Sequence, residues 1–329
     1  MVPALFLRSD PLDPGHGSSR FEARSFRPCV PRGSAPLVRE VPASVKGVQS
    51  SLGSLLVRLL RRRQWVAAGY VTGWMVVSAL PERVGRRLFR AGGGYAGWPT
   101  QLERNLTRVL GRPPTGGEIR ASHDSYARYW YEAFALTTIV PDHLAIEGLE
   151  HLDRSSGAVI TLTHSGNWDL AGVALVREVS GLSTVAEHLR PEELYQAFVG
   201  YRKALGFTVY PHDCHPLPQL EEDVRGGRVV AMMGERDLKG RGISVDFFGE
   251  EATFPAGPAV LAARAGVPLP VADVNFTEAG WGLQLRPAIE VTTVEETTQR
   301  IAREFEHTIA AHPTDWHMLQ PVWVADRAR

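Results

Sequence analysis

The feature that most constrains the fold is a short apolar run that ends in a histidine, with an aspartate five residues later. The run covers residues 158–163 and continues into His164-Ser-Gly-Asn-Trp-Asp169. A short apolar run predicts a buried strand, and Ser-Gly-Asn is typical of a turn. Residues 168–178 have helical character, so His164 and Asp169 flank a strand-to-helix turn, where α/β proteins place reactive side chains at the carboxyl edge of the sheet.

The spacing between these two ionisable residues also favours a turn. On one continuous helix, residues five positions apart point about 140° away from each other. If His164 lies in the loop and Asp169 in the first helical turn, the carboxylate can fold back onto the imidazole. A histidine held by a carboxylate is suited to act as a general base.

Strand and helix signals alternate along the rest of the chain and predict an α/β fold with a central, mostly parallel sheet flanked by helices. With 329 residues and 44% hydrophobic content, the chain can bury one large core or two modest ones. Strands are predicted at 158–163, 183–186, 208–210, 229–233, 270–276 and 283–285. Helices are predicted within 45–80 and at 100–110, 118–138, 168–178, 191–205, 218–225, 257–265 and 294–311.

Composition excludes several classes of function. The chain carries 36 Lys and Arg against 36 Asp and Glu, so no overall positive field favours nucleic acid as a partner. Its two cysteines, Cys29 and Cys214, are too few for a disulfide framework and suit a reducing cytoplasm. There is no CxxC pair, and the His212-Asp-Cys-His215 loop is better explained as surface polar residues than as metal ligands. We therefore predict neither a metal nor a cofactor.

Residues 1–45 differ in composition from the rest of the chain. Prolines at positions 3, 11, 14, 28, 31, 36 and 42, together with scattered arginines, leave little that could be buried. We expect this tail to be disordered, or its start codon to be assigned too early. A transit or signal peptide is the alternative, although the tail lacks the uninterrupted apolar core of a secretory signal.

Residues 46–95 predict helices that dock on a membrane surface. The stretch from Trp65 to Leu80 is apolar, but a helix needs about 20 such residues to span a bilayer, and this stretch is shorter. Arginines at 58, 61–63, 83, 86, 87 and 90 form a basic zone around it. Basic residues near Trp65, Tyr70 and Trp74 suit anionic lipid headgroups and the interfacial aromatic belt. The alternative is an ordinary hydrophobic helix packed against the domain, with solvated arginines.

No familiar nucleophile or nucleotide motif accompanies His164. The chain has no Gly-x-Ser-x-Gly elbow, Walker loop or dinucleotide glycine fingerprint, and Ser165 is interpreted as a turn residue. A general base without a nucleophile suits direct transfer of a group from an activated donor such as a thioester. The thiol of a thioester has a pKa of about 8.5, so it leaves readily. Backbone N–H groups around Gly166 and Asn167, at a helix start, are candidates to hold the developing oxyanion.

A second acidic residue follows another predicted buried strand. Residues 229–233 lead into Gly-Glu235-Arg-Asp. Because the ends of neighbouring parallel strands converge, we expect Glu235 to reach the imidazole nitrogen of His164 that Asp169 does not contact. A loop salt bridge between Glu235 and a nearby arginine is the alternative.

The segment after Glu235 and two arginines are candidates for binding a donor. Residues 240–258 are rich in glycine and aromatic residues, and we predict that they form a pocket wall that admits an acyl chain. Arg202 and Arg241 are candidates for contacts with donor phosphates.

Taken together, these phrases resemble a known enzyme family. His164-Ser-Gly-Asn-Trp-Asp169 matches the His-x4-Asp box of the glycerolipid and lipid A late acyltransferases, and Asp246-Phe-Phe-Gly with Phe254-Pro-Ala-Gly-Pro258 looks like a second block of the lipid A branch. The resemblance is closer still to the phosphatidylinositol mannoside acyltransferases and covers roughly residues 66–326. It is carried by Val185-Ala-Glu187, Leu194-Tyr-Gln-x-Phe, Tyr201-Arg202, Leu205-Gly-Phe, Glu235-Arg-Asp-Leu238, Val245-Asp-Phe-Phe-Gly-Glu250 and His312-Pro-x-Asp-Trp-His-Met-Leu-Gln-Pro321.

This resemblance implies a glycerolipid-acyltransferase-like fold, with residues 96–329 as the catalytic domain. It implies a monotopic enzyme on the cytoplasmic face of the plasma (inner) membrane. The implied reaction moves a palmitoyl-like group from acyl-CoA, the co-substrate, to the 6-hydroxyl of a mannose on phosphatidylinositol mannosides.

The resemblance also implies roles for individual residues. His164 is the base, Glu235 holds it, and Asp169 supports the site. Glu187 and Arg202 match positions that line the family's site. Arg264, on the predicted helix 257–265, is a further candidate for donor contacts.

Two alternatives stay open. A related acyltransferase could act on another envelope lipid, such as a lysophospholipid, because acceptor choice depends on pocket shape rather than on the base. A non-catalytic lipid-binding protein could keep the same fold, although a binder has no need for an imidazole supported by carboxylates.

Overall fold

The computed structural model describes residues 45–95, 100–136, 139, 144–152, 156–188, 192–237, 240–278 and 280–327. Residues 1–44, which make up nearly all of the predicted N-terminal tail, lie outside the described residues.

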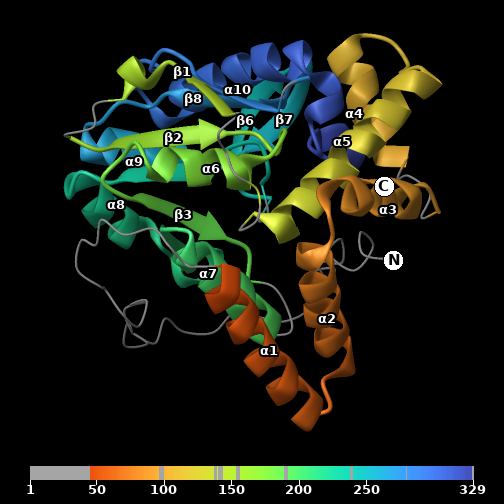
Figure 1. Ribbon diagram of the computed structural model, residues 1–329. Helices are drawn as coiled ribbons and strands as arrows, with labels where there is room; N and C mark the ends of the chain where they lie inside the picture. Colours follow the sequence, from red (N-terminus) through yellow and green to blue (C-terminus); the bar gives the residue numbers. More distant parts are fainter. Residues whose placement is uncertain are drawn as a thin grey trace, which may run out of the picture.

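A seven-stranded sheet forms the centre of the molecule (Figure 1). Its order is β1 (Leu144–Glu147), β9 (Trp281–Leu285), β8 (Val271–Phe276), β2 (Ala158–Leu162), β5 (Val229–Met233), β3 (Leu182–Ala186) and β4 (Phe207–Pro211). In the described part of the sheet, β8 and β9 are antiparallel and the other paired strands are parallel. The predicted mostly parallel sheet is confirmed, and it aligns the carboxyl ends of β2, β5 and β3 at one edge.

Helices cover both faces of this sheet, as predicted. Alternate residues of β2 point to opposite faces, so Ile160 packs in one hydrophobic cluster and Val159 in another. The first cluster includes residues of α5 (Gly116–Ala135), α6 (Trp168–Val176) and α7 (Glu192–Ala204). The second includes residues of α8 (Leu217–Arg225), α9 (Gly257–Ala265) and α10 (Val294–Ala311).

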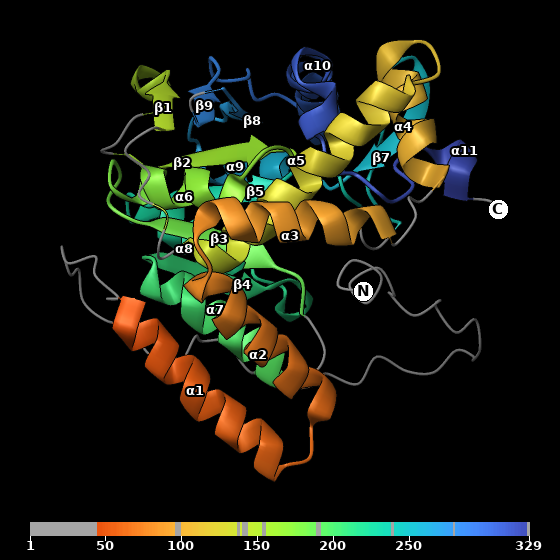
Figure 2. The ribbon, with the colours of Figure 1, turned by 45° about the vertical axis from the view of Figure 1, so that its right-hand side comes forward.

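The N-terminal helices form a hairpin that extends away from the sheet (Figures 1 and 2). It consists of α1 (Val45–Arg61) and α2 (Trp65–Ala79), which pack together and contact α7. The arginine-rich stretch that follows forms α3 (Glu82–Tyr95), which packs against α5. Among the described residues, no helix combines the length and apolarity needed to cross a bilayer.

The remaining elements are short. They are α4 (Thr100–Leu110), which packs near α10, and the single turns η2 (Leu149–His151), η3 (His212–Cys214), η4 (Pro313–Asp315) and α11 (Val324–Arg327). Sequence periodicity did not predict β1, because a four-residue strand gives too short a pattern to detect.

The prediction for residues 240–258 was wrong. Most of this segment forms an antiparallel hairpin of β6 (Ile243–Phe247) and β7 (Glu250–Phe254), which packs on α10. Phe247 and Phe254 are fully buried in the second hydrophobic cluster, where Phe247 stacks on Trp323. These aromatic residues fill a core on the face of the sheet away from the cavity described below, so they do not provide a wall for a ligand.

Candidate active site

The loop between β2 and α6 is a tight, well-capped turn. Gly166 has a φ of 55°, and a Cβ at this position would lie 2.8 Å from the carbonyl oxygen of Val274. Only glycine combines this backbone conformation with such a close approach. Asn167 caps α6, since its Oδ1 accepts a hydrogen bond of 2.9 Å from the N–H of Leu170. The turn therefore fixes the direction in which His164 leaves β2.

Glu235 holds the imidazole of His164. Its Oε1 lies 2.8 Å from His164 Nδ1 and also accepts the backbone N–H of His164. Burial raises the pKa of Glu235, but the His164 charge and these hydrogen bonds more than offset that effect, so the pKa lies below its usual value. An ionised Glu235 can only accept, which makes Nδ1 the protonated nitrogen and leaves the lone pair of His164 on Nε2.

The strand register makes this contact possible. Leu162 of β2 pairs with Met233 of β5, so the residues that follow both strands emerge side by side. Gly234 is needed at the crossing because a Cβ there would lie 2.4 Å from Thr161 Oγ1. The predicted reach of Glu235 to the imidazole is present in the structure. Among the described residues, Glu235 forms no salt bridge to an arginine, which was the alternative.

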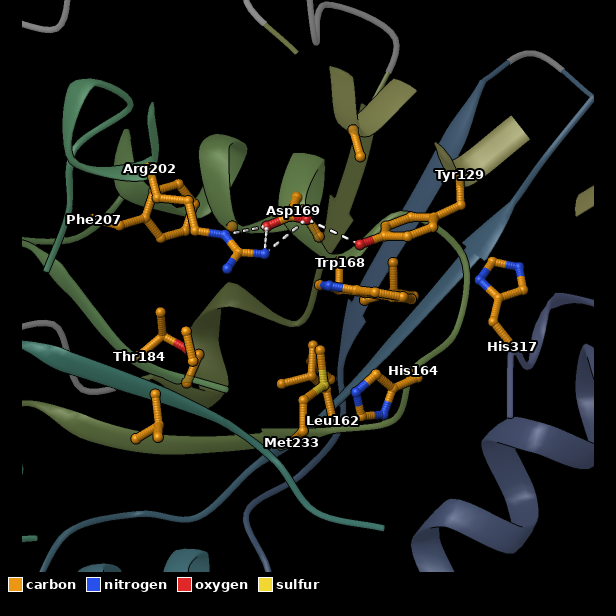
Figure 3. A pocket seen from close by; sticks show the side chains of 18 of the residues that line it. Tyr129, Leu162, His164, Trp168, Asp169, Thr184, Arg202, Phe207, Met233 and His317 are labelled. Carbon is orange, nitrogen blue, oxygen red and sulfur yellow. Dashed lines mark hydrogen bonds and ion pairs between the residues drawn. The ribbon is translucent and has the colours of Figure 1, made fainter. Parts of the chain in front are cut away.

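Asp169 faces away from His164, contrary to the first expectation that it folds back onto the imidazole. Its carboxylate pairs with the partly buried guanidinium of Arg202 at 2.9 Å and accepts a hydrogen bond of 3.2 Å from the hydroxyl of Tyr129 (Figure 3). Burial, reinforced by the Asp169 charge, raises the pKa of Tyr129 well above its usual value, so this hydroxyl stays protonated and donates. Asp169 therefore ties α6 to α7 and α5.

A cavity of about 320 Å³ lies between these helices and the sheet. In Figure 3, Phe207 and Thr184 lie toward one end and His164 and His317 toward the other, with Arg202, Asp169 and Tyr129 along one wall. The wall formed by the sheet is largely apolar and includes Ile160, Leu162, Leu182, Ala231, Met233 and Val274. Buried apolar walls with a few placed polar groups are typical of a site for a small or elongated apolar ligand.

The structure brings some predicted binding residues to this cavity. Glu187 and Arg202 both line it, and Glu187 pairs with Arg236 at 3.2 Å. The guanidinium of Arg202 is already paired with Asp169, so it is not a free cation for donor phosphates. The exposed Arg241 and Arg264 are not part of the described lining, and Arg264 lies on α9 beside Glu221.

One of the two predicted backbone oxyanion donors is engaged elsewhere. The N–H of Gly166 donates to the carbonyl oxygen of Asp315 at 3.0 Å, so it does not face a substrate. Asn167 is buried, and its side chain serves the helix cap and donates to Glu132 at 2.8 Å. The prediction for Gly166 was wrong because it treated the turn in isolation, whereas the C-terminal segment pairs with it.

Sequence reasoning missed several residues that line the cavity near His164. Tyr129 packs against Trp168 with its ring tilted by 30° and the ring centroids 3.9 Å apart, and Trp168 in turn meets the imidazole of His164 edge-on at 5.3 Å. Arg236 and His317 also belong to the lining. Clustered aromatics on α5 and the phrase from His312 to Pro321 were visible in the sequence, but nothing local indicated that they meet at His164.

The geometry supports proton abstraction at one end of an apolar cavity. Glu235 orients the imidazole and stabilises it when charged, and Nε2 carries the lone pair that accepts a proton. Among the described residues, no cluster of His, Cys, Asp and Glu has the geometry of a metal site. The site is therefore suited to activating a hydroxyl group beside a bound apolar chain.

Comparisons with known proteins match nearly the whole described chain. The family model for bacterial lipid A biosynthesis acyltransferases matches residues 55–325. The phosphatidylinositol mannoside acyltransferase of Mycobacterium tuberculosis strain H37Rv is 48% identical over 278 residues, which cover 78% of this chain and 88% of that protein. The enzyme with the same name from Mycolicibacterium smegmatis is 45% identical over 277 residues, covering 78% and 91%.

Among solved structures, this chain is similar to the crystal structure of the 1-acyl-sn-glycerophosphate acyltransferase PlsC from Thermotoga maritima. The match has 12% sequence identity and a TM-score of 0.36, and it covers 70% of this chain and 99% of that one.

Proposed function

Because this chain belongs to the bacterial lipid A biosynthesis acyltransferase family and is an acyltransferase, we propose that it acylates phosphatidylinositol mannosides. In this proposal a palmitoyl-like group passes from acyl-CoA to the 6-hydroxyl of a mannose. The reaction takes place at the cytoplasmic face of the membrane, where acyl-CoA is available. The observation that carries the proposal is the Glu235-held imidazole of His164 at one end of an apolar cavity.

The proposed reaction is a direct transfer with His164 as the general base. Nε2 takes the proton of the mannose hydroxyl as its oxygen attacks the thioester carbonyl, so a C–O bond forms and a tetrahedral oxyanion develops. Collapse of this intermediate breaks the C–S bond, and the proton on Nε2 passes to the departing thiolate. The products are the acylated lipid and free CoA, and no covalent enzyme intermediate is needed.

The shape of the cavity supports placing the acyl chain along the sheet. From His164, the lining runs past Met233 and Ala231 to Leu182 and Phe207 near the start of their strands. Leu182 and Ala186 are four positions apart on β3, a distance of about 13 Å at the usual rise of a strand. A carbonyl beside His164 would therefore have an apolar path of this order for its chain.

The tip of the α1–α2 hairpin supports membrane docking. Val57, Leu60, Trp65 and Val66 are exposed there, with Trp65 at 66% of its full exposure, and they surround the exposed Arg61–Arg63. The other side of α2 is packed, since Val71 and Trp74 are buried in the hydrophobic cluster beside α7. Exposed apolar residues next to arginines suit insertion among anionic headgroups. The alternative, a hydrophobic helix packed against the domain with solvated arginines, agrees with the packed side of α2 and with the exposed Arg61–Arg63.

An acyl-transfer assay tests the proposal. The full chain is incubated with palmitoyl-CoA and a mannosylated phosphatidylinositol, and we expect free CoA and the acylated lipid to appear together only when both substrates are present. His164→Ala should abolish turnover, whereas His307→Ala on the exposed side of α10 should not. Thiol release at the same rate without acceptor would indicate a thioesterase, and transfer only to a lysophospholipid would indicate a different acceptor.

A vesicle-binding assay tests the docking proposal separately. Trp65→Ala should lower partitioning into anionic phospholipid vesicles about tenfold, since burying a large side chain contributes roughly 1.5–3 kcal/mol. Val324→Ala is the matched control, because Val324 is an exposed apolar residue on α11. Equal partitioning of the two variants would contradict docking through the hairpin tip.

A further inference from the structure

The turn that carries His164 is paired with a short segment from the C-terminal end of the chain. The N–H of His317 donates to the carbonyl oxygen of His164 at 2.8 Å, and the N–H of Gly166 donates to the carbonyl oxygen of Asp315 at 3.0 Å. Between these bonds, Ser165 and Trp316 form an antiparallel bridge. Residues 164–166 and 315–317 thus make a small antiparallel ladder, so the backbone orientation of His164 depends on where residues 315–317 lie.

The side chain of Asp315 anchors this segment to two other elements. Its Oδ1 accepts a hydrogen bond of 2.7 Å from the hydroxyl of Ser125 on α5, and its Oδ2 accepts one of 2.8 Å from the N–H of Phe276 at the end of β8. Asp315 is buried, at 8% of its full exposure. A buried carboxylate without these donors would be costly, so α5 and β8 together determine the position of η4.

Ser125 also connects Asp315 to the ring of His317. His317 Nε2 lies 2.9 Å from Ser125 Oγ. Because the hydroxyl hydrogen is donated to Asp315, the oxygen accepts from His317, and Nε2 must carry the proton. Burial lowers the pKa of His317 to about 3, so the ring is neutral at physiological pH. The order of donation is therefore His317 Nε2–H to Ser125, and Ser125 Oγ–H to Asp315.

We propose that Ser125 and Asp315 are positioning residues for the general base. Through the buried chain His317–Ser125–Asp315 they hold residues 315–317 in place, fix His317 as the neutral Nε2–H tautomer, and thereby set the direction of the His164 imidazole. The inference rests on the proposed role of His164 and adds Ser125 and Asp315, which are not part of the described cavity lining. It also explains why the phrase from His312 to Pro321 lies beside the His-x4-Asp turn although the two are about 150 residues apart in sequence.

The chemistry explains why small displacements matter. Nε2 must meet the acceptor hydroxyl within hydrogen-bond distance while Nδ1 keeps its bond of 2.8 Å to Glu235. A displacement of about 1 Å at a reacting group can cost about 100-fold in rate. We therefore expect Ser125→Ala and Asp315→Asn to lower kcat by about 10- to 100-fold, with KM for palmitoyl-CoA changed less than threefold.

The test combines kinetics with nitrogen NMR on the full chain. Ser122→Ala is the matched control, because Ser122 is also buried on α5 and its hydroxyl has no hydrogen-bond partner among the described residues. The nitrogen shifts of His317 in ¹⁵N-histidine-labelled protein report its tautomer, and His317→Gln assigns the signal. Ser125→Ala should lose the Nε2–H signature and lower kcat, Ser125→Thr should restore both, and Ser122→Ala should change neither.

Each outcome decides the inference. If Ser125→Ala retains the kcat of Ser122→Ala, or if the His317 tautomer is unchanged in Ser125→Ala, the inference is wrong. If Asp315→Asn fails to fold, Ser125→Ala still gives the answer, because it removes only a hydroxyl. Wild-type protein that shows no transfer would instead overturn the proposed function, whereas active wild type with unaffected variants overturns this inference alone.

Discussion

Replacing Glu235 by glutamine separates the charge at the site from the hydrogen bonds. In the structure, one oxygen of Glu235 accepts both the backbone N–H and the Nδ1–H of His164, and the other oxygen is buried without a hydrogen-bond partner among the described residues. Glutamine fits the same space and keeps one oxygen that can accept both bonds. Glu235→Gln therefore preserves the tautomer of His164 and removes the negative charge beside it.

The size of the effect follows from the distance between the two groups. At 2.8 Å and an effective dielectric constant of about 20, a carboxylate and an imidazolium attract by at most about 6 kcal/mol. His164 is 21% exposed, so solvent screening reduces this attraction. A hydrogen bond to a charged group contributes about 3 kcal/mol at the upper end of its usual range. Losing about 3 kcal/mol from the transition state, in which the imidazole is charged, corresponds to roughly a 150-fold lower kcat.

The assay is steady-state acyl transfer from palmitoyl-CoA to a mannosylated phosphatidylinositol. Glu235→Gln should lower kcat by about two orders of magnitude with little change in KM, because the carboxylate touches His164 and not the acyl cavity. Glu222→Gln, on the exposed side of α8, is the matched control. If Glu235→Gln keeps kcat within threefold of this control, the carboxylate does not stabilise a charged His164 and the proposed role of Glu235 is wrong.

Three other perturbations test the rest of the site. Asp169→Asn leaves the partly buried Arg202 without its counter-charge, which should cost up to about 3 kcal/mol of stability, because solvent screens part of the lost attraction. The expected fall in Tm is roughly 6 °C in a melting experiment, and an unchanged Tm would contradict the structural role of this pair. The free energy of unfolding measured in urea should fall between pH 6.5 and about 3, because an unfolded chain protonates His317 over this range while the native state keeps it neutral, so stability present above pH 6.5 is lost as pH falls. His317→Gln should make that decline shallower and His307→Gln should not; parallel curves for the two variants would refute burial as the cause. Phe207→Leu shortens a side chain at the end of the cavity far from His164, where the Phe207 ring lies against Gly172. The variant should prefer longer acyl-CoA chains in a competition assay, and an unchanged preference would mean that the acyl chain lies elsewhere.

Local pattern was sufficient to predict the framework of the site. Short apolar runs bounded by turn residues identified β2 and β5, and parallel pairing of such strands brings the residues after them together. For this reason the approach of Glu235 to His164 was predictable from sequence, although the two residues are 71 positions apart. The helices α9 and α10 also begin and end at the predicted residues, since Pro258 and Gly266 mark the ends of α9 and Thr293 caps α10.

Contacts that no sheet register dictates were not predictable. Arg202 lies on α7 and Tyr129 on α5, and both reach Asp169 only because three helices pack on one face of the sheet. Residues 240–258 show a related difficulty, since glycines and aromatics suit a ligand pocket and a tightly packed hairpin equally well. The hairpin forms because Phe247 and Phe254 are buried under α10, a contact between distant parts of the chain that local sequence does not reveal.

The two acids near His164 have different physical roles, and the spacing of the His-x4-Asp phrase explains the difference. Five positions across a turn and into the first turn of α6 place Asp169 on the helix side of the cavity, where it meets Arg202 and Tyr129. The ring of the neighbouring Trp168 contacts both Tyr129 and the imidazole of His164. Glu235, on a neighbouring strand end, is the acid that contacts the imidazole directly. Loss of Asp169 should therefore appear first in stability, and loss of the Glu235 charge first in kcat.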